Sequence, residues 1–110
     1  MDARHSVPFS QRLCSRRTFG LTTLVIYPAK RFVYIIRSIE HPEKRYIGVT
    51  SDMMARLSAH NAGQNRSTAQ WKPWCVDVVI EFRTERMALR FEKYLKSGAG
   101  LAFAIRHFVE

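Results

Sequence analysis

The sequence predicts one α+β domain over residues 31–110, built from three β-strands and two principal helices. Two runs rich in β-branched and aromatic residues, 32–37 and 45–49, are separated by a short polar loop with a proline, a pattern typical of an antiparallel hairpin. A third run covers residues 74–82, and segments with helical signals lie between and after these strands. At 110 residues the chain can bury a modest core without disulfide bonds.

The predicted hairpin brings two tyrosines together. Tyr34 lies in the first strand and Tyr46 in the second. Antiparallel pairing places them close to opposite each other, so both rings can reach one site. Gly48 lies inside the second strand, where a residue without a side chain indicates close approach by another backbone or a ligand.

A helix with an arginine and a histidine on one face follows the hairpin. The segment Thr50-Ser51-Asp52 is a helix-start signal, and Gly63 is a stop signal. Between them, Arg56 and His60 lie four residues apart and therefore share a face. Packing of the neighbouring apolar face on the sheet would bring both side chains beside the strands.

The second principal helix carries a candidate carboxylate. Thr84 is its predicted N-cap, and the helix runs to about Lys96. Glu92 lies at the margin of the apolar stripe, where a partly desolvated carboxylate costs stability unless it has a partner. An ordinary ion pair with Lys96 is the simplest alternative use of this side chain. Residues 97–108 then read as a glycine break followed by a short, apolar, helical segment.

Residues 1–30 differ in composition from the rest of the chain. They are rich in Arg, Ser and Thr and contain a single acidic residue, Asp2. They fit an Arg-rich targeting peptide, a basic arm that binds nucleic acid, or upstream sequence included by a misplaced start codon. We expect most of this segment to be disordered.

Charge is the most informative feature of the composition. The net charge is +9, and residues 31–110 alone keep thirteen basic and eight acidic residues. A small domain this basic usually meets nucleic acid, with an acidic protein partner as the alternative. Cys14 and Cys75 form no metal-binding motif and suit a reducing cytoplasm. No apolar run approaches the roughly 20 residues that span a bilayer, so we expect a soluble protein without a membrane partner.

The candidate catalytic set combines acid–base, cationic and carboxylate groups: Tyr34, Tyr46, Arg56, His60 and Glu92. Hydrolysis of a phosphodiester needs a base to activate water and a cation to stabilise charge on the phosphoryl oxygens. A metal can assist the leaving oxygen, and a carboxylate must hold that metal. A single carboxylate suits a hard divalent ion such as Mg²⁺, held mainly through waters and the substrate phosphate. The same residues would also fit a nucleic-acid-binding module.

Four further side chains are candidate contacts for nucleic acid because amides and cations donate hydrogen bonds to phosphates. The polar, irregular segment 61–73 contributes Asn61, Arg66 and Lys72. Lys96 lies one helical turn after Glu92.

At these residues the sequence resembles the GIY-YIG nuclease superfamily, and most of all its small stand-alone bacterial members. Phe32-Val33-Tyr34 and Tyr46-Ile47-Gly48 correspond to the two half-motifs, with eleven residues between them. The pattern T-x-D-x-x-x-R-x-x-x-H-N is matched from Thr50 to Asn61. A tryptophan and then E-K-x-L-K-S-G are matched by Trp74 and by Glu92 to Gly98. The resemblance covers residues 32 to about 108.

The resemblance implies a three-stranded antiparallel sheet flanked by helices, in the order β-β-α-(α)-β-α. It also implies a nuclease site in which Glu92 binds one divalent metal ion, Mg²⁺ with Mn²⁺ as a substitute. Tyr34 or Tyr46 would activate or orient the attacking water, and Arg56 and His60 would contact the scissile phosphate. A tyrosine has an ordinary pKa of about 10, so either one would need help from a cation, and the choice between them stays open.

Two features depart from the family pattern. Phe32 replaces the first glycine of the motif, a position that supplies no reacting group and tolerates a strand residue. Residues 1–30 have no counterpart in the minimal domain. We expect no second DNA-binding domain, so contacts should be mainly to phosphates and therefore salt-sensitive.

Three functions follow from these observations. The leading one is a metal-dependent endonuclease that hydrolyses DNA, with structured, damaged or single-stranded forms as candidate substrates. The second is a non-catalytic nucleic-acid-binding module that kept the fold. The third is a nuclease subunit that needs a protein partner, docked on the basic arm or the apolar C-terminal segment. The oligomeric state stays open.

Overall fold

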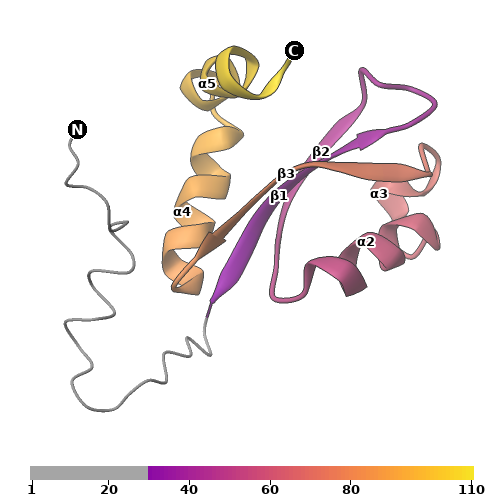
Figure 1. Cartoon of the computed structure of the whole chain (residues 1–110), viewed down its shortest axis with the longest axis horizontal. Coiled ribbons are helices and arrows are strands. Elements are labelled where there is room, and N and C mark those ends of the chain that lie inside the picture. The colour runs from indigo at the N-terminus through magenta and orange to yellow at the C-terminus, as the bar shows by residue number, and fades with distance from the viewer. Residues whose placement is uncertain (1–29) are drawn as a thin grey trace, which may run out of the picture.

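The computed structural model describes residues 30–110, so the predicted extension, apart from Lys30, lies outside the described residues. This range folds in the predicted order β-β-α-(α)-β-α, followed by the predicted C-terminal helical segment (Figure 1). The elements are β1 (Arg31–Ser38), β2 (Arg45–Thr50), α2 (Met53–Asn61), α3 (Arg66–Ala69), β3 (Trp74–Phe82), α4 (Glu85–Leu95) and α5 (Gly98–Phe108).

β1 is the central strand of an antiparallel sheet whose strand order is β2-β1-β3. Helices cover both faces of the sheet, so β1 is buried on both sides, and this explains its uninterrupted apolar run from Val33 to Ile36. The register between β1 and β3 shifts between Ile35 and Ile36, where β3 carries a bulge at Asp77. The predicted three-stranded antiparallel sheet is therefore confirmed.

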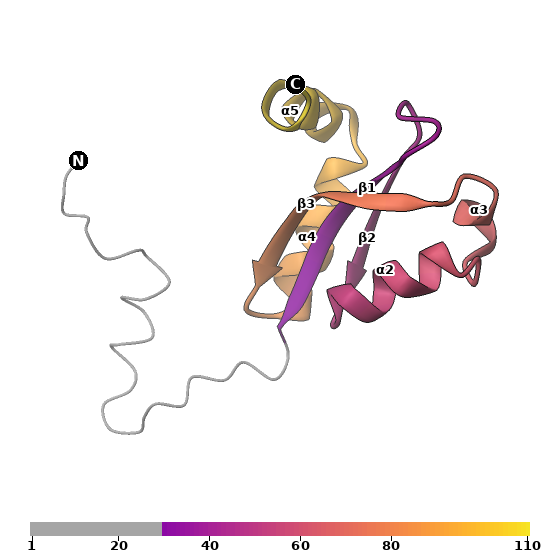
Figure 2. The same cartoon turned by 45° about the vertical axis from the view of Figure 1, so that its right-hand side comes forward.

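Two apolar cores lie on opposite faces of the sheet. Figures 1 and 2 show α4 on one side of the sheet and α2 with α3 on the other. The core under α4 and α5 is centred on four buried residues, Val33, Ile35, Ala88 and Leu95. The core on the α2 and α3 side is centred on Tyr34, Ile36 and Trp74. A polar cluster at Tyr34 is thus built from one layer of helices, while α4 approaches from the other layer.

Side-chain caps begin each of the longer helices. Asp52, Thr84 and Ser97 each accept a hydrogen bond from the backbone N–H three residues later. Asp52 and Thr84 confirm the two predicted helix starts. Gly63 has a φ of 78° just after α2, which confirms the predicted stop because this conformation favours glycine.

The glycines after α4 do not form the break that the sequence predicts. Ser97 caps α5 directly, and the helix begins at Gly98. Gly100 is buried in the first turn, where a Cβ atom would overlap the backbone carbonyl of Tyr94. This glycine therefore reflects the close packing of α5 on the end of α4. No helix within residues 30–110, α5 included, is long and apolar enough to cross a membrane.

Candidate active site

Tyr34 is the centre of a hydrogen-bonded cluster between β1 and α2. It is 0% exposed. Its hydroxyl lies 2.9 Å from His60 Nε2 and accepts a hydrogen bond of 3.1 Å from Arg56 Nε. One helical turn separates Arg56 from His60, so both side chains reach the same oxygen. The predicted meeting of this helical face with the first tyrosine is confirmed.

The space for the Tyr34 ring is created by Gly48 on the neighbouring strand. Gly48 is the direct partner of Tyr34 across the β1–β2 pair, whereas Tyr46 is opposite Ile36. A Cβ atom on Gly48 would lie 2.5 Å from the Tyr34 hydroxyl oxygen. The tyrosines are thus diagonal neighbours and not opposite each other, with ring centroids 6.2 Å apart. The group that approaches Gly48 is the Tyr34 side chain, and not the backbone or ligand that the sequence indicated.

His60 lies behind Tyr34, and both of its ring nitrogens have partners. Nδ1 is 2.7 Å from the hydroxyl oxygen of Thr68, which itself donates to the Asn65 carbonyl at 3.4 Å. We therefore assign the proton to Nδ1, so that Nε2 accepts a hydrogen bond from the Tyr34 hydroxyl. The opposite tautomer would leave the hydroxyl proton of buried Tyr34 without a described partner.

The burial of His60 changes the role expected for it. His60 is 0% exposed, so the direct contact with a scissile phosphate implied by the resemblance is not what this arrangement offers. His60 instead holds the Tyr34 hydroxyl from inside the protein. Thr68, 1% exposed, is a partner of His60 that the sequence did not identify, since its hydroxyl reads there only as a possible phosphate donor. A threonine in a polar segment carries no signal of its own, and its place follows from the way α3 folds back on α2.

The charges of the cluster are set by burial. Burial raises the pKa of the Tyr34 phenol, and the hydrogen bond and charge of Arg56 offset this only in part. Burial and then the charge of Arg56 lower the pKa of His60. The hydrogen bond to Tyr34 raises the pKa of Arg56. At neutral pH the cluster therefore combines a neutral phenol, a neutral imidazole and a cationic guanidinium.

Tyr46 and Arg56 are the parts of this cluster that solvent reaches, because both are partly exposed. The Tyr46 ring meets the His60 ring edge-on at a centroid distance of 5.0 Å. Tyr46 also helps to raise the pKa of Arg56, after the larger effect of Tyr34. A substrate phosphate can therefore approach Arg56 and Tyr46, with Tyr34 and His60 as the layer beneath.

Glu92 reaches the same region from α4, which packs on β1 and β2 from the opposite layer. Its side chain is 20% exposed and accepts a 2.8 Å ion-paired hydrogen bond from Lys96. Its charge is among the smaller causes, after burial, of the raised pKa of Tyr34, so its carboxylate lies within electrostatic reach of the phenol. The ion pair with Lys96, which was the alternative use of Glu92, is thus present. A role for Glu92 in the tyrosine site stays a prediction.

The donor chemistry of Glu92 fits a hard divalent cation. Within residues 30–110 no group of three or more His, Cys, Asp or Glu side chains is placed to hold a metal. A cation at Glu92 would complete its coordination with water and phosphate oxygens, as magnesium commonly does. Lys96 would have to release one carboxylate oxygen or share the carboxylate with the cation.

The four candidate nucleic-acid contacts lie in different surroundings. Both amide atoms of Asn61 bond the Trp74 backbone, with the side chain donating to the carbonyl at 3.2 Å and accepting from the N–H at 2.6 Å. This amide is therefore engaged in joining α2 to β3. Arg66 and Lys72 are exposed on α3 and the loop after it, and Lys96 is paired with Glu92.

Comparison with known proteins finds both a family and relatives. The model of the GIY-YIG catalytic domain matches residues 30–100. Structure-specific endonuclease subunit SLX1 of Candida dubliniensis is 34% identical over 91 residues, which are 76% of this chain and 30% of the relative. SLX1 of Malassezia globosa is 38% identical over 63 residues, 54% of this chain and 14% of the relative. The SLX1 homolog of Giardia intestinalis is 34% identical over 65 residues, 56% of this chain and 18% of the relative.

These relatives are eukaryotic, whereas the motifs alone resemble small bacterial members of the family. The chain spans less than a third of the length of each relative. The matched domain includes all five candidate catalytic residues and the sheet and helices that position them. The chain belongs to the GIY-YIG family.

Proposed function

We propose that this protein is an endonuclease that hydrolyses phosphodiester bonds in branched or otherwise structured DNA. One observation carries the proposal: Arg56 and the two tyrosines form a single cluster, and Glu92 stands within electrostatic reach of it from another helix. These are the cation, the acid–base groups and the carboxylate that phosphodiester hydrolysis requires. Membership of a catalytic-domain family supports the same conclusion.

The burial of the two tyrosines supports different roles for them. Tyr46 is partly exposed and can contact a water molecule that attacks the phosphate. Tyr34 is fully buried with a raised pKa, so it serves to hold Arg56 and His60 in place. We therefore assign water activation or orientation to Tyr46 and stabilisation of phosphate charge to Arg56. Evidence that Tyr34 activates the water while Tyr46 only holds its neighbours in place would contradict this assignment.

Glu92 is the proposed ligand for one divalent metal ion, with Mg²⁺ as the expected ion and Mn²⁺ as a substitute. When bound, this ion supplies positive charge beside the leaving oxygen. Lys96, paired with Glu92, would be available to contact a phosphate next to the ion. A cytoplasmic location remains a prediction from the sequence.

The names of the relatives supply the proposed substrate class and partner. Each is called a structure-specific endonuclease subunit or its homolog, and this chain matches only part of each. We therefore propose branched DNA as the substrate and a second protein as the partner that completes the active assembly. The word subunit specifically favours the partner-dependent form over a nuclease that works alone.

A cleavage assay tests this function. The full chain is incubated with end-labelled single-stranded, duplex, flapped and four-way DNA, with Mg²⁺, Mn²⁺ or a chelator. Metal-dependent nicking of the branched forms is the expected result. Binding to all substrates without cleavage, with and without a partner protein, would favour the non-catalytic module instead.

The same assay separates the two tyrosines. Tyr46→Phe should lower the cleavage rate while changing the midpoint of thermal unfolding little, because Tyr46 is partly exposed. Tyr34→Phe should lower both, because His60 and Arg56 lose a buried partner worth about 1–3 kcal/mol. Equal loss of stability in the two variants would contradict the assignment.

A further inference from the structure

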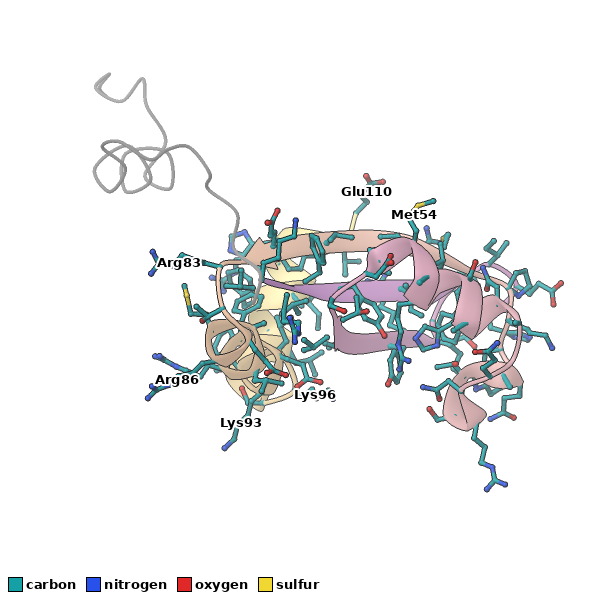
Figure 3. The ribbon with its side chains drawn as sticks, turned by 90° about the horizontal axis from the view of Figure 1, so that it is seen from below. Met54, Arg83, Arg86, Lys93, Lys96 and Glu110 are labelled. Atoms are coloured by element: carbon teal, nitrogen blue, oxygen red, sulfur yellow. The ribbon has the colours of Figure 1, made fainter. Side chains whose placement is uncertain are left out.

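The exposed side of α4 carries a line of three cations: Arg86, Arg90 and Lys93. Their spacing of four and then three residues places them on one face of the helix. Ala88 and Leu95 are buried on the core side of the same helix, so the cations form its outer surface. Figure 3 shows Arg86 and Lys93 projecting from α4 away from the sheet. We call these three residues the α4 basic face.

The α4 basic face is not neutralised by the described part of the protein. Four cations elsewhere in residues 30–110 do have acidic partners: Lys30 with Glu81, Arg37 and Arg45 with Asp77, and Lys96 with Glu92. Arg86, Arg90 and Lys93 form no ion pair with any residue from 30 to 110. A local surplus of positive charge on a rigid element is the electrostatic footprint of a polyanion site.

The α4 basic face lies beside the candidate metal ligand. Glu92 immediately precedes Lys93, and a helix turns about 100° per residue, so the carboxylate and the basic face are adjacent sectors of α4. Lys96, paired with Glu92, occupies the sector between them. A strand whose phosphate is held at Glu92 would therefore continue over cations that belong to the same helix.

We propose that the α4 basic face binds the phosphate backbone of a duplex DNA arm next to the bond that is cut. This inference rests on the proposed nuclease function for the identity of the polyanion. The three cations extend over about 10 Å of helix, and the phosphates of a duplex have regular, rigid spacing, so one arm can meet all three together. The contacts are to backbone and carry no sequence information.

The test is the salt dependence of DNA binding by the full chain. The triple variant R86Q/R90Q/K93Q is compared with wild type on a flapped duplex, in chelator so that no cleavage occurs. Each lost phosphate contact should reduce the slope of log affinity against log salt by about 0.9, so three should reduce it by about 2.7. Wild type should then lose about 40-fold more affinity than the variant between about 50 and about 200 mM salt.

A matched control separates local contact from total charge. The triple variant K30Q/R31Q/R106Q removes the same charge from β1, its preceding residue and α5, all of which lie outside α4. This control should retain nearly the full wild-type slope. Equal slopes for the two triple variants, or a wild-type slope in R86Q/R90Q/K93Q, would overturn the proposal and leave an acidic protein as the occupant.

Two outcomes separate this inference from the nuclease proposal. Binding is measured without metal, so a reduced slope of log affinity against log salt in R86Q/R90Q/K93Q supports DNA binding by the α4 basic face even if no substrate is ever cut. An effect confined to single-stranded DNA would overturn the assignment to a duplex arm. Thermal unfolding of both triple variants should match wild type, because the substituted side chains lie at the surface.

Discussion

Replacement of Gly48 by alanine should damage the candidate site through a single methyl group. The new Cβ would lie 2.5 Å from the Tyr34 hydroxyl oxygen and 2.6 Å from the ring carbon that bears it, whereas ordinary contacts begin near 3.4 Å. The ring must therefore move by roughly 1 Å, and Tyr34 is fully buried with its hydroxyl bonded to His60 and Arg56. The methyl group cannot be accommodated without loss of these bonds.

The cost follows from three effects. Overpacking a core costs about 1–3 kcal/mol, and a broken hydrogen bond adds about 1 kcal/mol. Alanine also has less conformational entropy than glycine in the unfolded chain, which stabilises the folded protein by about 0.4–1 kcal/mol. We expect a net loss of about 2 kcal/mol, which lowers the unfolding midpoint of a domain this size by about 8–16 °C. Displacement of Arg56 should also reduce cleavage, by up to about 100-fold.

Thermal and urea unfolding of Gly48→Ala, beside the cleavage assay, measure both effects. Gly98→Ala is the matched control, because a Cβ there meets nothing within 4 Å and the position is the start of α5. This control should be neutral or more stable by up to about 1 kcal/mol. A Gly48→Ala protein within about 0.5 kcal/mol of wild type, with full activity, would contradict a close contact between the new Cβ atom and the Tyr34 hydroxyl.

Three further predictions concern buried or partly buried polar groups. Thr68→Val should cost about 1–3 kcal/mol of stability and move the His60 proton from Nδ1, which imidazole ¹⁵N shifts report, while Thr68→Ser should restore both. An unmoved tautomer would contradict the hydrogen-bond chain assigned from Thr68 through His60 to Tyr34. Asn61→Ala should cost a similar amount in urea unfolding but leave DNA affinity unchanged, and weakened binding would return Asn61 to the contact surface. Because the pKa of His60 is lower in the folded protein than in the unfolded chain, the unfolded chain binds more protons below about pH 6.5. The free energy of unfolding should therefore fall as the pH drops below about 6.5. Urea unfolding from about pH 5 to about pH 8 measures this slope, which should be absent in His60→Gln.

Features encoded locally could be predicted from the sequence. The runs of β-branched residues predicted the three strands because strand propensity depends on the residue types within each run. Asp52, Thr84 and Gly63 gave helix boundaries because caps act within one turn. The pairing of Arg56 with His60 on one face followed from helix geometry alone.

Features that depend on tertiary packing could not be predicted. The burial of His60 requires α3 to fold over it, and no periodic signal marks Thr68 as its partner. Asn61 has the chemistry of a phosphate contact, and its hydrogen bonds with the Trp74 backbone become evident only when α2 meets β3. Gly100 resembles a helix breaker in sequence, and its contact with the end of α4 gives it the opposite role.

A single-turnover cleavage rate tests whether Glu92 belongs to a nuclease site. Glu92→Gln is compared with Glu85→Gln, an exposed carboxylate two turns earlier on α4, using branched DNA with Mg²⁺ and any partner protein that activity requires. We expect Glu92→Gln to lose about 100-fold or more in rate while DNA affinity and unfolding midpoint stay near wild type, and Glu85→Gln to cleave normally. Equal rates for the two variants, or loss of the fold in Glu92→Gln, would contradict this role of Glu92.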